Sequence, residues 1–530
     1  MELSLVLTTL TIVTFISTVT SQSPIQNFVS CFSKFHEPSH SPITQVIYTP
    51  NNKTFSTILN QHIRNKRFKL GSTPKPLAII TAKSASDVQA TVKCAKSNNI
   101  QIRIRSSGHD FEGYSYVSDV PFIILDMFLI NGINIDIHNE VAWVESGATI
   151  GKLYYTISKT SEFYAFPAGI CYSLCAGGHF SGGGYGPLTR KFGLAADNIV
   201  DAKIVDVNGK ILDRKAMGED LFWAITGGGG ASFGVILSWK IKLVKIPNLV
   251  TVFDVTKTLE EGAIDLVYKW QLIASKMPDE LFIIAKPRVV KNAKDGKNVV
   301  QVHFVGLFVG TNEKLLPLIN KNFPELGLKS SDCHQLPWVR STLIWNGIPT
   351  EANLKALLDE PKANETVYVK AQSDILMKPI PKEGIKAIFQ KMIEDDTFFM
   401  YWIPYGGIMN KISTSAKPFP NRKGILFMIQ YSNYWREDTP GTIEREINFS
   451  RSLFKFMTPY VSNSPRGAIM NYRDADIGAN LPSNVTKMEI SKVYGIKYFK
   501  DNFGRLVNAK TKVDPDNFFR YEQSIPTKLK

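Results

Sequence analysis

The hydrophobic pattern between residues 74 and 245 alternates between the spacings typical of strands and of helices. Short apolar runs predict buried strands at 76–80 and 122–127. Isoleucines that alternate with glutamine and arginine predict a half-buried strand over 100–104. Ser86 is predicted to cap a helix before this strand, because apolar residues follow it at helical spacing. This succession of elements predicts an α+β or α/β fold for the first half of the chain.

The pattern changes between about residues 246 and 467, where glycine becomes rarer. Apolar runs predict strands at 299–308 and 424–431, and apolar residues at helical spacing predict a helix around 385–392. These elements predict a second domain, built from a sheet with covering helices. The tail, residues 471–524, carries further motifs and is expected to rejoin the first domain.

The first 21 residues are predicted to be a signal peptide that is removed before Gln22. An apolar stretch interrupted only by threonines precedes Val19 and Ser21, which are small residues at the −3 and −1 positions of a cleavage site. The segment departs from the usual pattern because it lacks Lys and Arg before the apolar stretch and carries Glu2. No later stretch reaches the roughly 18 apolar residues of a membrane span. The mature protein is therefore expected to be soluble and translocated.

Length and charge narrow the possible classes of protein. A chain of 530 residues exceeds one ordinary hydrophobic core, so two domains or more are expected. The 44% hydrophobic and 21% charged content is typical of a globular protein. The formal charge of +15 would suit acidic polymers, but no run of five or more Lys and Arg residues occurs. We interpret the charge as a basic solvated surface and expect no nucleic-acid partner.

Translocation makes the sequons and the cysteines informative. The predicted glycosylation sites are the four Asn-X-Ser/Thr sequons at Asn52, Asn364, Asn448 and Asn484. The chain has five cysteines, and an odd number in a secreted protein leaves at least one thiol unpaired or otherwise bonded.

Two glycine clusters indicate close approach of the backbone to a ligand. Residues 177–186 contain six glycines, and residues 227–230 with Gly234 form a second cluster. Glycine permits positive φ angles, so that successive N–H groups can surround phosphate oxygens. Neither cluster has the spacing of a Rossmann fingerprint or a P-loop. The alternative is that these glycines serve only tight turns.

The loops 105–113 and 167–179 carry the reactive side chains His109, Cys171 and Cys175. Taken alone, His109 fits a hydrogen-bonding or capping residue as well as a reactive one. The two cysteines fit a disulfide or a buried thiol pair equally well. Their spacing is not that of a zinc site, and no histidine cluster completes one, so no metal is expected.

These loops resemble those of the berberine bridge enzyme-like flavoproteins of plants, within the vanillyl-alcohol-oxidase type of FAD enzymes. Further matching segments lie at 193–199, 220–224, 471–474 and 513–519. The resemblance covers essentially the whole mature chain and is greatest to the branch that contains the cannabinoid-acid oxidocyclases. It implies an α+β fold: an FAD-binding domain in two subdomains, and a substrate domain with an antiparallel sheet and covering helices.

The resemblance also implies a doubly attached FAD. His109 would bond the flavin 8α-methyl carbon, and Cys171 would bond ring carbon C6. Cys31 and Cys94 match the family's disulfide, which leaves Cys175 and Cys333 as free thiols. The glycine clusters would surround the pyrophosphate, and Asn517 would return to the cofactor from the tail. The remaining residues that the resemblance assigns to FAD binding are Arg105, Ser106, Gly108, Gly177, Gly178, His179, Gly183, Gly184, Asp197, Asn198, Ile199 and Gly234.

Oxidation then requires a base beside the flavin. FAD accepts a hydride while a side chain removes a proton from the substrate hydroxyl or amine. Tyr472 matches the family's tyrosine base, and Tyr185 and Gln430 match positions that face the substrate. A phenol with a pKa near 10 is a weak base unless a nearby cation or donor stabilises the phenolate. The alternative for Tyr472 is an aromatic residue of the core.

The chain departs from the family at three positions near the predicted flavin. Phe111 replaces a tyrosine found in many relatives, and Tyr172-Ser173 replaces the usual Pro-Thr after Cys171. Leu174 stands where relatives that react well with oxygen carry valine. A larger side chain there would block oxygen, so the sequence predicts a dehydrogenase or a slow oxidase.

Other functions were weighed against oxidation. Residues 230–234 fit the G-x-S-x-G pattern of a hydrolase with Ser232 as nucleophile, but no clear helix follows. A carbohydrate oxidase, and a flavin-dependent cyclase or cycloaddition enzyme without net oxidation, are the alternatives within the flavoprotein class.

The sequence thus predicts a signal peptide (1–21), an FAD-binding domain (22–246), a substrate domain (247–467) and a C-terminal segment (468–530) that returns to the FAD domain. The expected activity is oxidation of a small phenolic, alkaloid or alcohol metabolite by hydride transfer to FAD, with or without coupled cyclisation. The expected partners are the small-molecule substrate and molecular oxygen or another electron acceptor, with no membrane partner. The protein is expected to be a monomer in the secretory pathway, in the extracellular space, the apoplast or the vacuole.

Overall fold

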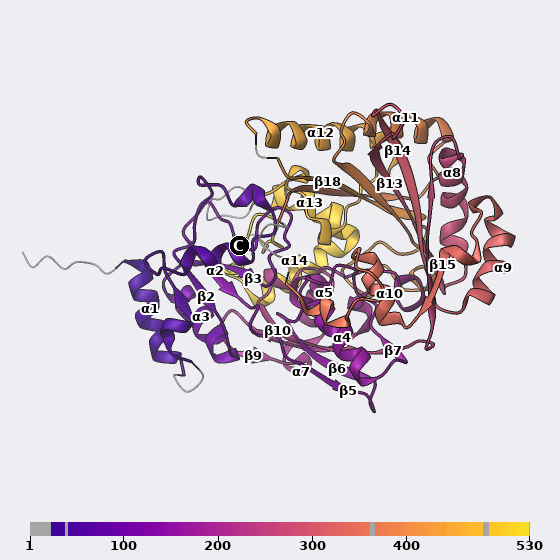
Figure 1. Ribbon diagram of the computed structural model, residues 1–530. Helices are drawn as coiled ribbons and strands as arrows, with labels where there is room; N and C mark the ends of the chain where they lie inside the picture. Colours follow the sequence, from indigo (N-terminus) through magenta and orange to yellow (C-terminus); the bar gives the residue numbers. More distant parts are fainter. Residues whose placement is uncertain (1–22, 38–40, 361–365, 438, 481–486, 529–530) are drawn as a thin grey trace, which may run out of the picture.

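The computed structural model describes residues 23–37, 41–360, 366–437, 439–480 and 487–528. The predicted signal peptide and the sequons' Asn364 and Asn484 lie outside these residues. Helices and mostly antiparallel sheets make up the fold, and the predicted α+β class is confirmed. Figure 1 shows an N-terminal part, a sheet below the centre and a larger sheet on the opposite side, with the C-terminal helices between them.

The N-terminal part is a four-stranded sheet with helices against it. Its strand order is β1-β2-β4-β3, in which β4 is parallel to both of its neighbours and β1 is antiparallel to β2. The strands are β1 (Ile47–Tyr48), β2 (Ala78–Thr81), β3 (Gln101–Arg105) and β4 (Phe122–Asp126), and the helices are α1 (Pro24–Phe35), α2 (Phe55–Gln61) and α3 (Ala85–Ser97). The predicted disulfide between Cys31 and Cys94 is present and joins α1 to α3.

Two details of this part differ from the prediction. The N-cap of α3 is Ser84, not Ser86, because Asp87 at the third helical position completes a reciprocal capping box with Ser84. Strand β3 is largely buried, whereas its alternating arginines predicted a half-buried strand. Arg103 and Arg105 are buried because each pairs with a carboxylate, Arg103 with Glu522 at 2.7 Å.

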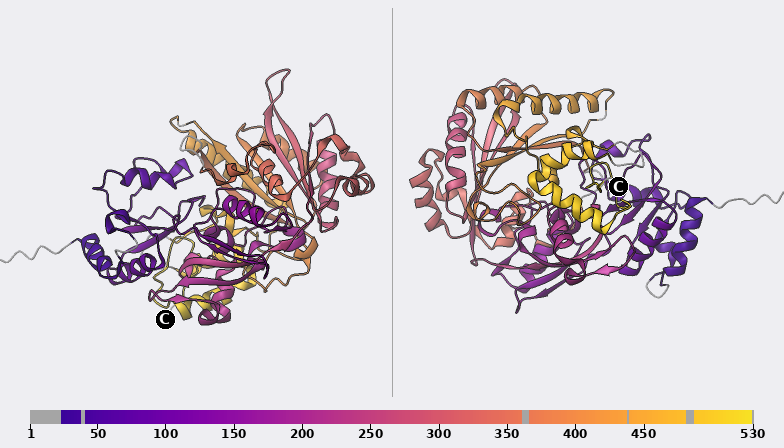
Figure 2. Two further views of the ribbon diagram at one scale, coloured as in Figure 1. Left: turned by 60° about the horizontal axis from the view of Figure 1, so that its bottom comes forward. Right: turned by 180° about the vertical axis from the view of Figure 1, so that it is seen from behind.

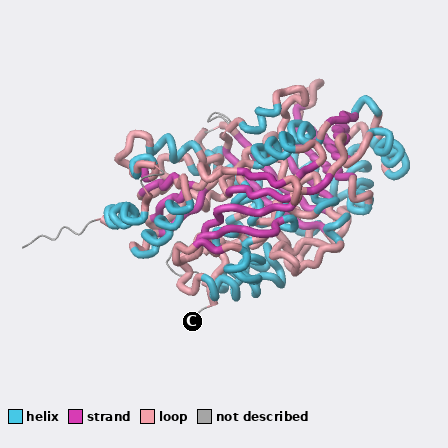
Figure 3. Tube along the Cα trace, turned by 90° about the horizontal axis from the view of Figure 1, so that it is seen from below, coloured by secondary structure: helices cyan, strands magenta, loops and turns pink. Residues whose placement is uncertain are grey.

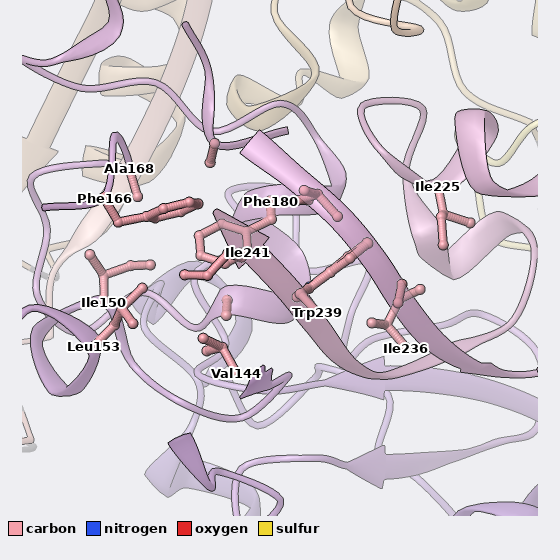
Figure 4. Packing of buried hydrophobic residues seen from close by; sticks show 14 of the residues in the cluster. Val144, Ile150, Leu153, Phe166, Ala168, Phe180, Ile225, Ile236, Trp239 and Ile241 are labelled. Carbon is pink, nitrogen blue, oxygen red and sulfur yellow. The ribbon is translucent and has the colours of Figure 1, made fainter. Parts of the chain in front are cut away.

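A five-stranded antiparallel sheet, in the order β5-β6-β10-β8-β9, forms the second part of the first half. Its strands are β5 (Ile133–Asp136), β6 (Val141–Glu145), β8 (Ile199–Val205), β9 (Ile211–Leu212) and β10 (Val235–Lys242). The helices beside it are α4 (Ile150–Thr160), α5 (Ala176–Ser181), α6 (Thr189–Phe192) and α7 (Arg214–Ile225), and β7 (Tyr164–Ala165) pairs with β11 (Val244–Lys245). The largest core cluster lies on this sheet, where Trp239 of β10 is fully buried among aliphatic and aromatic side chains (Figure 4).

The third part is a seven-stranded antiparallel sheet in the order β15-β12-β14-β13-β17-β18-β16. Its strands are β12 (Val250–Lys257), β13 (Leu281–Lys291), β14 (Asn298–Phe308), β15 (Cys333–Leu336), β16 (Tyr368–Leu376), β17 (Phe398–Pro404) and β18 (Phe427–Trp435). The helices of this part are α8 (Ala263–Ile273), α9 (Asn312–Asn322), α10 (Trp338–Trp345), α11 (Lys382–Met392) and α12 (Thr442–Phe456). The predicted strand at 424–431 thus begins and ends later, as β18.

Alternation along these strands gives the sheet two different faces. Leu281, Ile283 and Ala285 of β13 belong to the cluster that includes α8, α11 and α12, and these helices cover the outer face (Figure 1). Phe282 and Ile284, the residues between them, point to the opposite face. Seen from below, strands run through the middle of the molecule with helices and loops around them (Figure 3).

The C-terminal helices pack against the first half of the chain. Helix α13 (Met488–Phe499) is followed by α14 (Phe503–Val513), which packs against α7. From behind, both helices lie against the centre of the molecule (Figure 2). Buried Lys510 of α14 donates to the carbonyl oxygen of Ser232 at 2.7 Å, which ties the tail to the second glycine cluster. No helix within the described residues is long and apolar enough to cross a membrane.

Candidate active site

A cavity of about 550 Å³ lies between the first half of the chain and the inner face of the seven-stranded sheet. Its walls come from the loop after β3, the segments around α5, the second glycine cluster, strands β13, β17 and β18, and the segments before α13 and after α14. Parts of the chain that are far apart in sequence therefore meet at one site.

His109 reaches the cavity from the loop that follows β3. Gly108 has a φ of +71°, and a Cβ there would lie 1.7 Å from the backbone oxygen of His62, so only glycine lets the chain pass. At the end of β3, Arg105 is fully buried and pairs with Asp126 Oδ2 at 2.6 Å. The loop is therefore held rigidly where it carries His109 into the cavity.

The imidazole of His109 is uncharged at neutral pH. Burial lowers the pKa of His109 to about 3. Its Nε2 is 2.9 Å from Ser173 Oγ, which leaves Nδ1 for a second partner. A neutral imidazole with a free ring nitrogen is the form that can act as a nucleophile.

Cys171 and Cys175 are both free thiols, so the disulfide that the sequence left open between them is not formed. Cys175 is buried, its Sγ lies 3.1 Å from the oxygen of Gly147, and burial raises its pKa to about 12. Cys171 Sγ lies 3.4 Å from Ser173 Oγ, the hydroxyl that also contacts His109. The side chains of His109 and Cys171 therefore converge on one end of the cavity.

The glycine clusters form a backbone-lined stretch of the cavity. Gly178 is exposed to the cavity, and a Cβ there would meet no atom within 4 Å. Gly229, Gly230 and Gly234 line the cavity from the second cluster. A cavity wall made of glycine backbone, with open space beside it, suits a dinucleotide, because phosphates bind backbone N–H groups.

Arginines stand along the cavity as possible partners for phosphate. Arg473 Nη1 donates to Asp110 Oδ2 at 2.7 Å, and its guanidinium lies 4.8 Å from the centre of the Tyr521 ring. Arg64, Arg103 and Arg520 also line the cavity. The residues present thus fit FAD: two nucleophiles at one end, a glycine-lined passage, and positive charge.

The other predicted catalytic residues lie at the end of the cavity next to the seven-stranded sheet. The hydroxyl groups of Tyr185 and Tyr472 form a hydrogen bond, and their rings meet edge to face with centroids 5.9 Å apart. Phe111, which follows the His109 loop, lies 6.0 Å from the Tyr472 ring. The structure therefore brings Tyr472, Tyr185 and the loop that carries His109 together.

Burial keeps both tyrosines of this pair in the protonated form at neutral pH. Burial raises the pKa of Tyr472 well above its usual value and outweighs the lowering effect of the hydrogen bond with Tyr185. Burial also raises the pKa of Tyr185. The contact that lowers the pKa of Tyr472 is its hydrogen bond with the Tyr185 hydroxyl.

The sheet contributes an apolar, aromatic wall. Tyr401 of β17 stands opposite Gln430 of β18 in the antiparallel register, and both line the cavity. Gln430 Nε2 donates to Ser432 Oγ at 3.1 Å. The other side chains that the strands β13, β16, β17 and β18 present to the cavity are Phe282, Ile284, Val369, Ile403 and Tyr434. No charged side chain of these described strands lines it.

Some residues assigned to FAD from the sequence do not line the cavity. Ser106, Gly108, His109, Cys171, Gly177, Gly178, His179, Tyr185, Gly234, Gln430 and Tyr472 line it. Arg105, Gly183, Gly184, Asp197, Asn198, Ile199 and Asn517 are not among the lining residues. Asp197 instead pairs with Arg422 at 2.7 Å, and Asn198 donates to the carbonyl oxygens of Phe192 and Leu194. These two side chains support the turns around the cavity.

The sequence analysis missed several lining residues. Arg473 was part of the Asn-Tyr-Arg-Asp segment but received no role, and Asp110 follows His109 directly. Three further lining residues lie on strands: Phe282, Tyr401 and Tyr434. Alternation along a strand predicts which residues share a face, but it does not predict that this face lines a site. Trp345 at the end of α10 had no signal in the sequence.

The structure does not support the hydrolase alternative. Ser232 is fully buried, its hydroxyl contacts Tyr521 and accepts from the N–H of Ile525 at 3.1 Å, and it does not line the cavity. Within the described residues, no His, Cys, Asp and Glu cluster suits a metal ion.

Comparison with known proteins agrees with this geometry. A family described as "FAD binding domain" matches residues 76–214, and one described as "Berberine and berberine like" matches residues 468–526. Berberine bridge enzyme-like 3 of Arabidopsis thaliana is 49% identical over 507 residues, which are 95% of this chain and 93% of that protein.

Solved structures share the fold. The structure of berberine bridge enzyme-like 28 from Arabidopsis thaliana has a TM-score of 0.89 at 44% identity, over 95% of this chain and all of that one. Phl p 4, a grass pollen allergen with glucose dehydrogenase activity, has a TM-score of 0.88 at 39% identity, over 95% of this chain and all of that one. A variant of Phl p 4 in which valine replaces isoleucine is described as a glucose oxidase.

The fold and the site define an FAD-dependent oxidoreductase that acts on small molecules. The glycine-lined passage, the basic side chains and the aromatic pocket belong to one continuous cavity. The chain belongs to the berberine bridge enzyme-like family.

Proposed function

We propose that the protein oxidises a small, largely apolar phenolic, alkaloid or alcohol metabolite, using FAD that is attached to both His109 and Cys171. The observation that carries the proposal is the shared contact of these two side chains with Ser173, at the end of the cavity that also holds Tyr472. Bound there, FAD would supply hydride acceptance.

The residues of this chain prepare the substrate for oxidation. The Tyr185–Tyr472 pair accepts the proton of the substrate hydroxyl or amine at the Tyr472 oxygen. The Gln430 amide orients the polar group, while Phe282 and Ile284 pack against the apolar part and exclude water. Because burial raises the pKa of Tyr472, only a small fraction is phenolate at neutral pH, and this fraction grows as the pH rises.

A carbohydrate oxidase is a second candidate, favoured by the glucose dehydrogenase activity of the relative Phl p 4. The sheet wall argues against it here. A sugar carries several hydroxyl groups, whereas the sheet presents aromatic and aliphatic side chains with Gln430 as its amide. Burying unpaired hydroxyls costs about 1–3 kcal/mol each, so an aromatic substrate fits this wall better.

The preferred electron acceptor follows from Leu174, which directly follows Ser173 and lines the cavity. A leucine there restricts the approach of oxygen more than valine does. The valine-for-isoleucine variant of Phl p 4, a glucose oxidase, supports the idea that branched side chains near the flavin control oxygen access. We therefore infer a dehydrogenase or a slow oxidase. Oxygen uptake as fast as substrate-driven flavin reduction would overturn this assignment.

The secretory route rests on several sequence and structural features. The predicted signal peptide, the Cys31–Cys94 disulfide and the exposed Asn52 and Asn448 support it. We propose an extracellular, apoplastic or vacuolar monomer with glycans at its sequons.

The first experiment is to produce the protein through a secretory pathway and precipitate it in acid. Yellow colour that stays with the polypeptide, with flavin on both the His109 and the Cys171 peptides after digestion, supports the attachment. Flavin that washes out overturns it. Anaerobic bleaching by aromatic alcohols but not by sugars supports the substrate class, and product formation without bleaching would favour the flavin-dependent cyclase.

A further inference from the structure

The Cys171 loop is held by one side chain that contacts the backbone on both sides of the cysteine. Asn346 Nδ2 donates to the carbonyl oxygen of Ile170 at 2.7 Å, and the N–H of Tyr172 donates to Asn346 Oδ1 at 3.4 Å. The two contacts fix the peptide groups that precede and follow Cys171, which limits the rotation of its Cα–Cβ direction.

The contact from Tyr172 depends on a departure of this chain from its family. Where relatives carry proline after the cysteine, this position has no N–H to donate, and the ring itself restricts φ. Here residue 172 is tyrosine, so the backbone is freer and presents a donor. Asn346 accepts that donor and restrains the loop from outside.

The rest of the loop is held by the backbone of α4. The N–H of Gly151 donates to the oxygen of Tyr172, and the N–H of Ile150 donates to the oxygen of Leu174, both at 2.8 Å. These contacts act after Cys171 and leave the peptide before it to Asn346. The Tyr154 hydroxyl of α4 donates to the carbonyl oxygen of Gly169 at 2.8 Å, so removing the Asn346 amide would release the peptide between Ile170 and Cys171 while Gly169 stays held.

Asn346 is itself well anchored. It is the C-cap of α10, and its Nδ2 also donates to the carbonyl oxygen of Thr342 one turn earlier, at 2.8 Å. Trp345, the last residue of α10, lines the cavity. One helix end thus supports the cysteine loop and forms part of the cavity wall.

We propose that Asn346 is a positioning residue that aims the Cys171 thiol at the flavin ring for the second covalent link. The inference rests on the proposed attachment of FAD. In forming the link, the Cys171 sulfur bonds to a ring carbon, the thiol proton and the ring proton leave, and two electrons pass to dioxygen, which becomes hydrogen peroxide. Misplacing the sulfur slows this step, whereas the His109 link forms on another loop.

The test compares Asn346→Leu with a matched control, Asn322→Leu. Asn322, the last residue of α9, also donates its side-chain amide to a carbonyl one turn earlier, that of Leu318 at 2.8 Å, but it does not line the cavity. Each secreted protein is denatured and digested, and flavin on the His109 and Cys171 peptides is quantified by mass. For Asn346→Leu, the ratio of Cys171-linked to His109-linked flavin falls about tenfold or more. The control keeps the wild-type ratio.

Asn346→Asp provides the second variant, because it is almost isosteric and keeps the acceptor for Tyr172 while losing the donor to Ile170. The same ratio is expected to fall for it too. An unchanged ratio in both Asn346 variants, or an equal loss of both links, overturns the inference. A wild-type protein without flavin on Cys171 instead overturns the proposed attachment, so the two failures are distinguishable.

Discussion

Burial favours the neutral form of both kinds of titratable side chain at the site. It lowers the pKa of His109 to about 3 and raises the pKa of Tyr472 above its usual value. Both groups are therefore uncharged at neutral pH, which suits a nucleophilic imidazole but leaves the phenol a weak base. If Tyr472 is the base, as proposed, its raised pKa should make proton removal limit the reaction.

The pH dependence of flavin reduction tests this limit. Because the base is the phenolate, we expect the rate constant of anaerobic substrate-driven flavin reduction to rise about tenfold per pH unit from pH 6 to 9, without a plateau. Stopped-flow absorbance at saturating substrate measures it. A plateau near pH 7 would show that another group is the base.

Replacement of Tyr472 by phenylalanine separates its chemistry from its packing. We expect Tyr472→Phe to reduce the rate constant of flavin reduction by about 10²- to 10⁴-fold, while the flavin stays attached to the chain. Tyr434→Phe is the matched control, because Tyr434 lines the same cavity without bonding to the pair. An equal loss in both variants would contradict a specific role of Tyr472.

His62 makes the stability of the protein sensitive to acid. It stacks on Phe128 with ring centroids 4.2 Å apart, and burial lowers its pKa from 6.5 to about 4. As the pH falls, the unfolded chain takes up the proton first, so the contribution of neutral His62 is present above pH 6.5 and is lost towards pH 4. As the pH falls through this window, the wild type should lose about 3 kcal/mol more unfolding free energy than His62→Gln.

Urea unfolding of His62→Gln and wild type at pH 7 and pH 4 measures this difference. His138→Gln is the control, since His138 is exposed. The interpretation is wrong if His62→Gln loses as much stability as the wild type between the two pH values.

At the scale of elements, short helices and glycine turns carry backbone to the cofactor. Helix α5 begins at Ala176, and its third residue, Gly178, faces open space in the cavity. The loop before α5 carries Cys171, and the loop after β3 carries His109. Regular elements thus end at the cavity, and irregular backbone lines it.

Gly178 distinguishes the demands of the fold from those of the cofactor. Alanine favours a helix more than glycine, so Gly178→Ala should leave the unfolding temperature of the flavin-free protein unchanged or slightly raised. The new methyl group projects into the cavity, so the flavin-to-protein ratio should fall by about tenfold. Absorbance ratios measure it, with Gly504→Ala, at an exposed position of α14, as control. A wild-type flavin-to-protein ratio in Gly178→Ala would contradict a cofactor that lies against Gly178.

At the scale of the whole molecule, buried Lys370 of β16 joins three distant segments. Its Nζ lies 2.7 Å from Glu112, 2.6 Å from Asp474 and 3.1 Å from Asp476. Glu112 follows the His109 loop, and Asp474 follows Tyr472 by two residues. Although burial alone would lower the pKa of Lys370, the three carboxylates raise it, so the ammonium stays charged. One side chain thus holds the His109 loop and the Tyr472 segment to the seven-stranded sheet.

Removing this charge should destabilise the protein strongly. Lys370→Met leaves buried carboxylates without their partner and should reduce the free energy of unfolding by about 3–5 kcal/mol. Denaturant unfolding measures it. Lys382→Met, which breaks an exposed pair with Asp265, should leave stability nearly unchanged. Equal effects of the two variants would show that the Lys370 network does not join these segments energetically.

The sequence by itself determined much of the protein, because local patterns and motifs carry that information. Strand spacing predicted β4 and β14 within a residue, and short motifs brought His109, Cys171 and Tyr472 to attention. Even so, the cap of α3 was misplaced by two residues, because a reciprocal bond with Asp87 decided it.

Only the tertiary structure decided which residues face one another. The burial of Arg103 depends on Glu522, more than 400 residues later, and the pKa of Tyr472 depends on burial and on the hydrogen bond with Tyr185. The support of the Cys171 loop by Asn346 likewise joins segments that no local pattern relates. Hydrogen bonds, ion pairs and desolvation act over a few ångströms in space. Such partners therefore meet only when the whole chain has folded, and local sequence does not identify them.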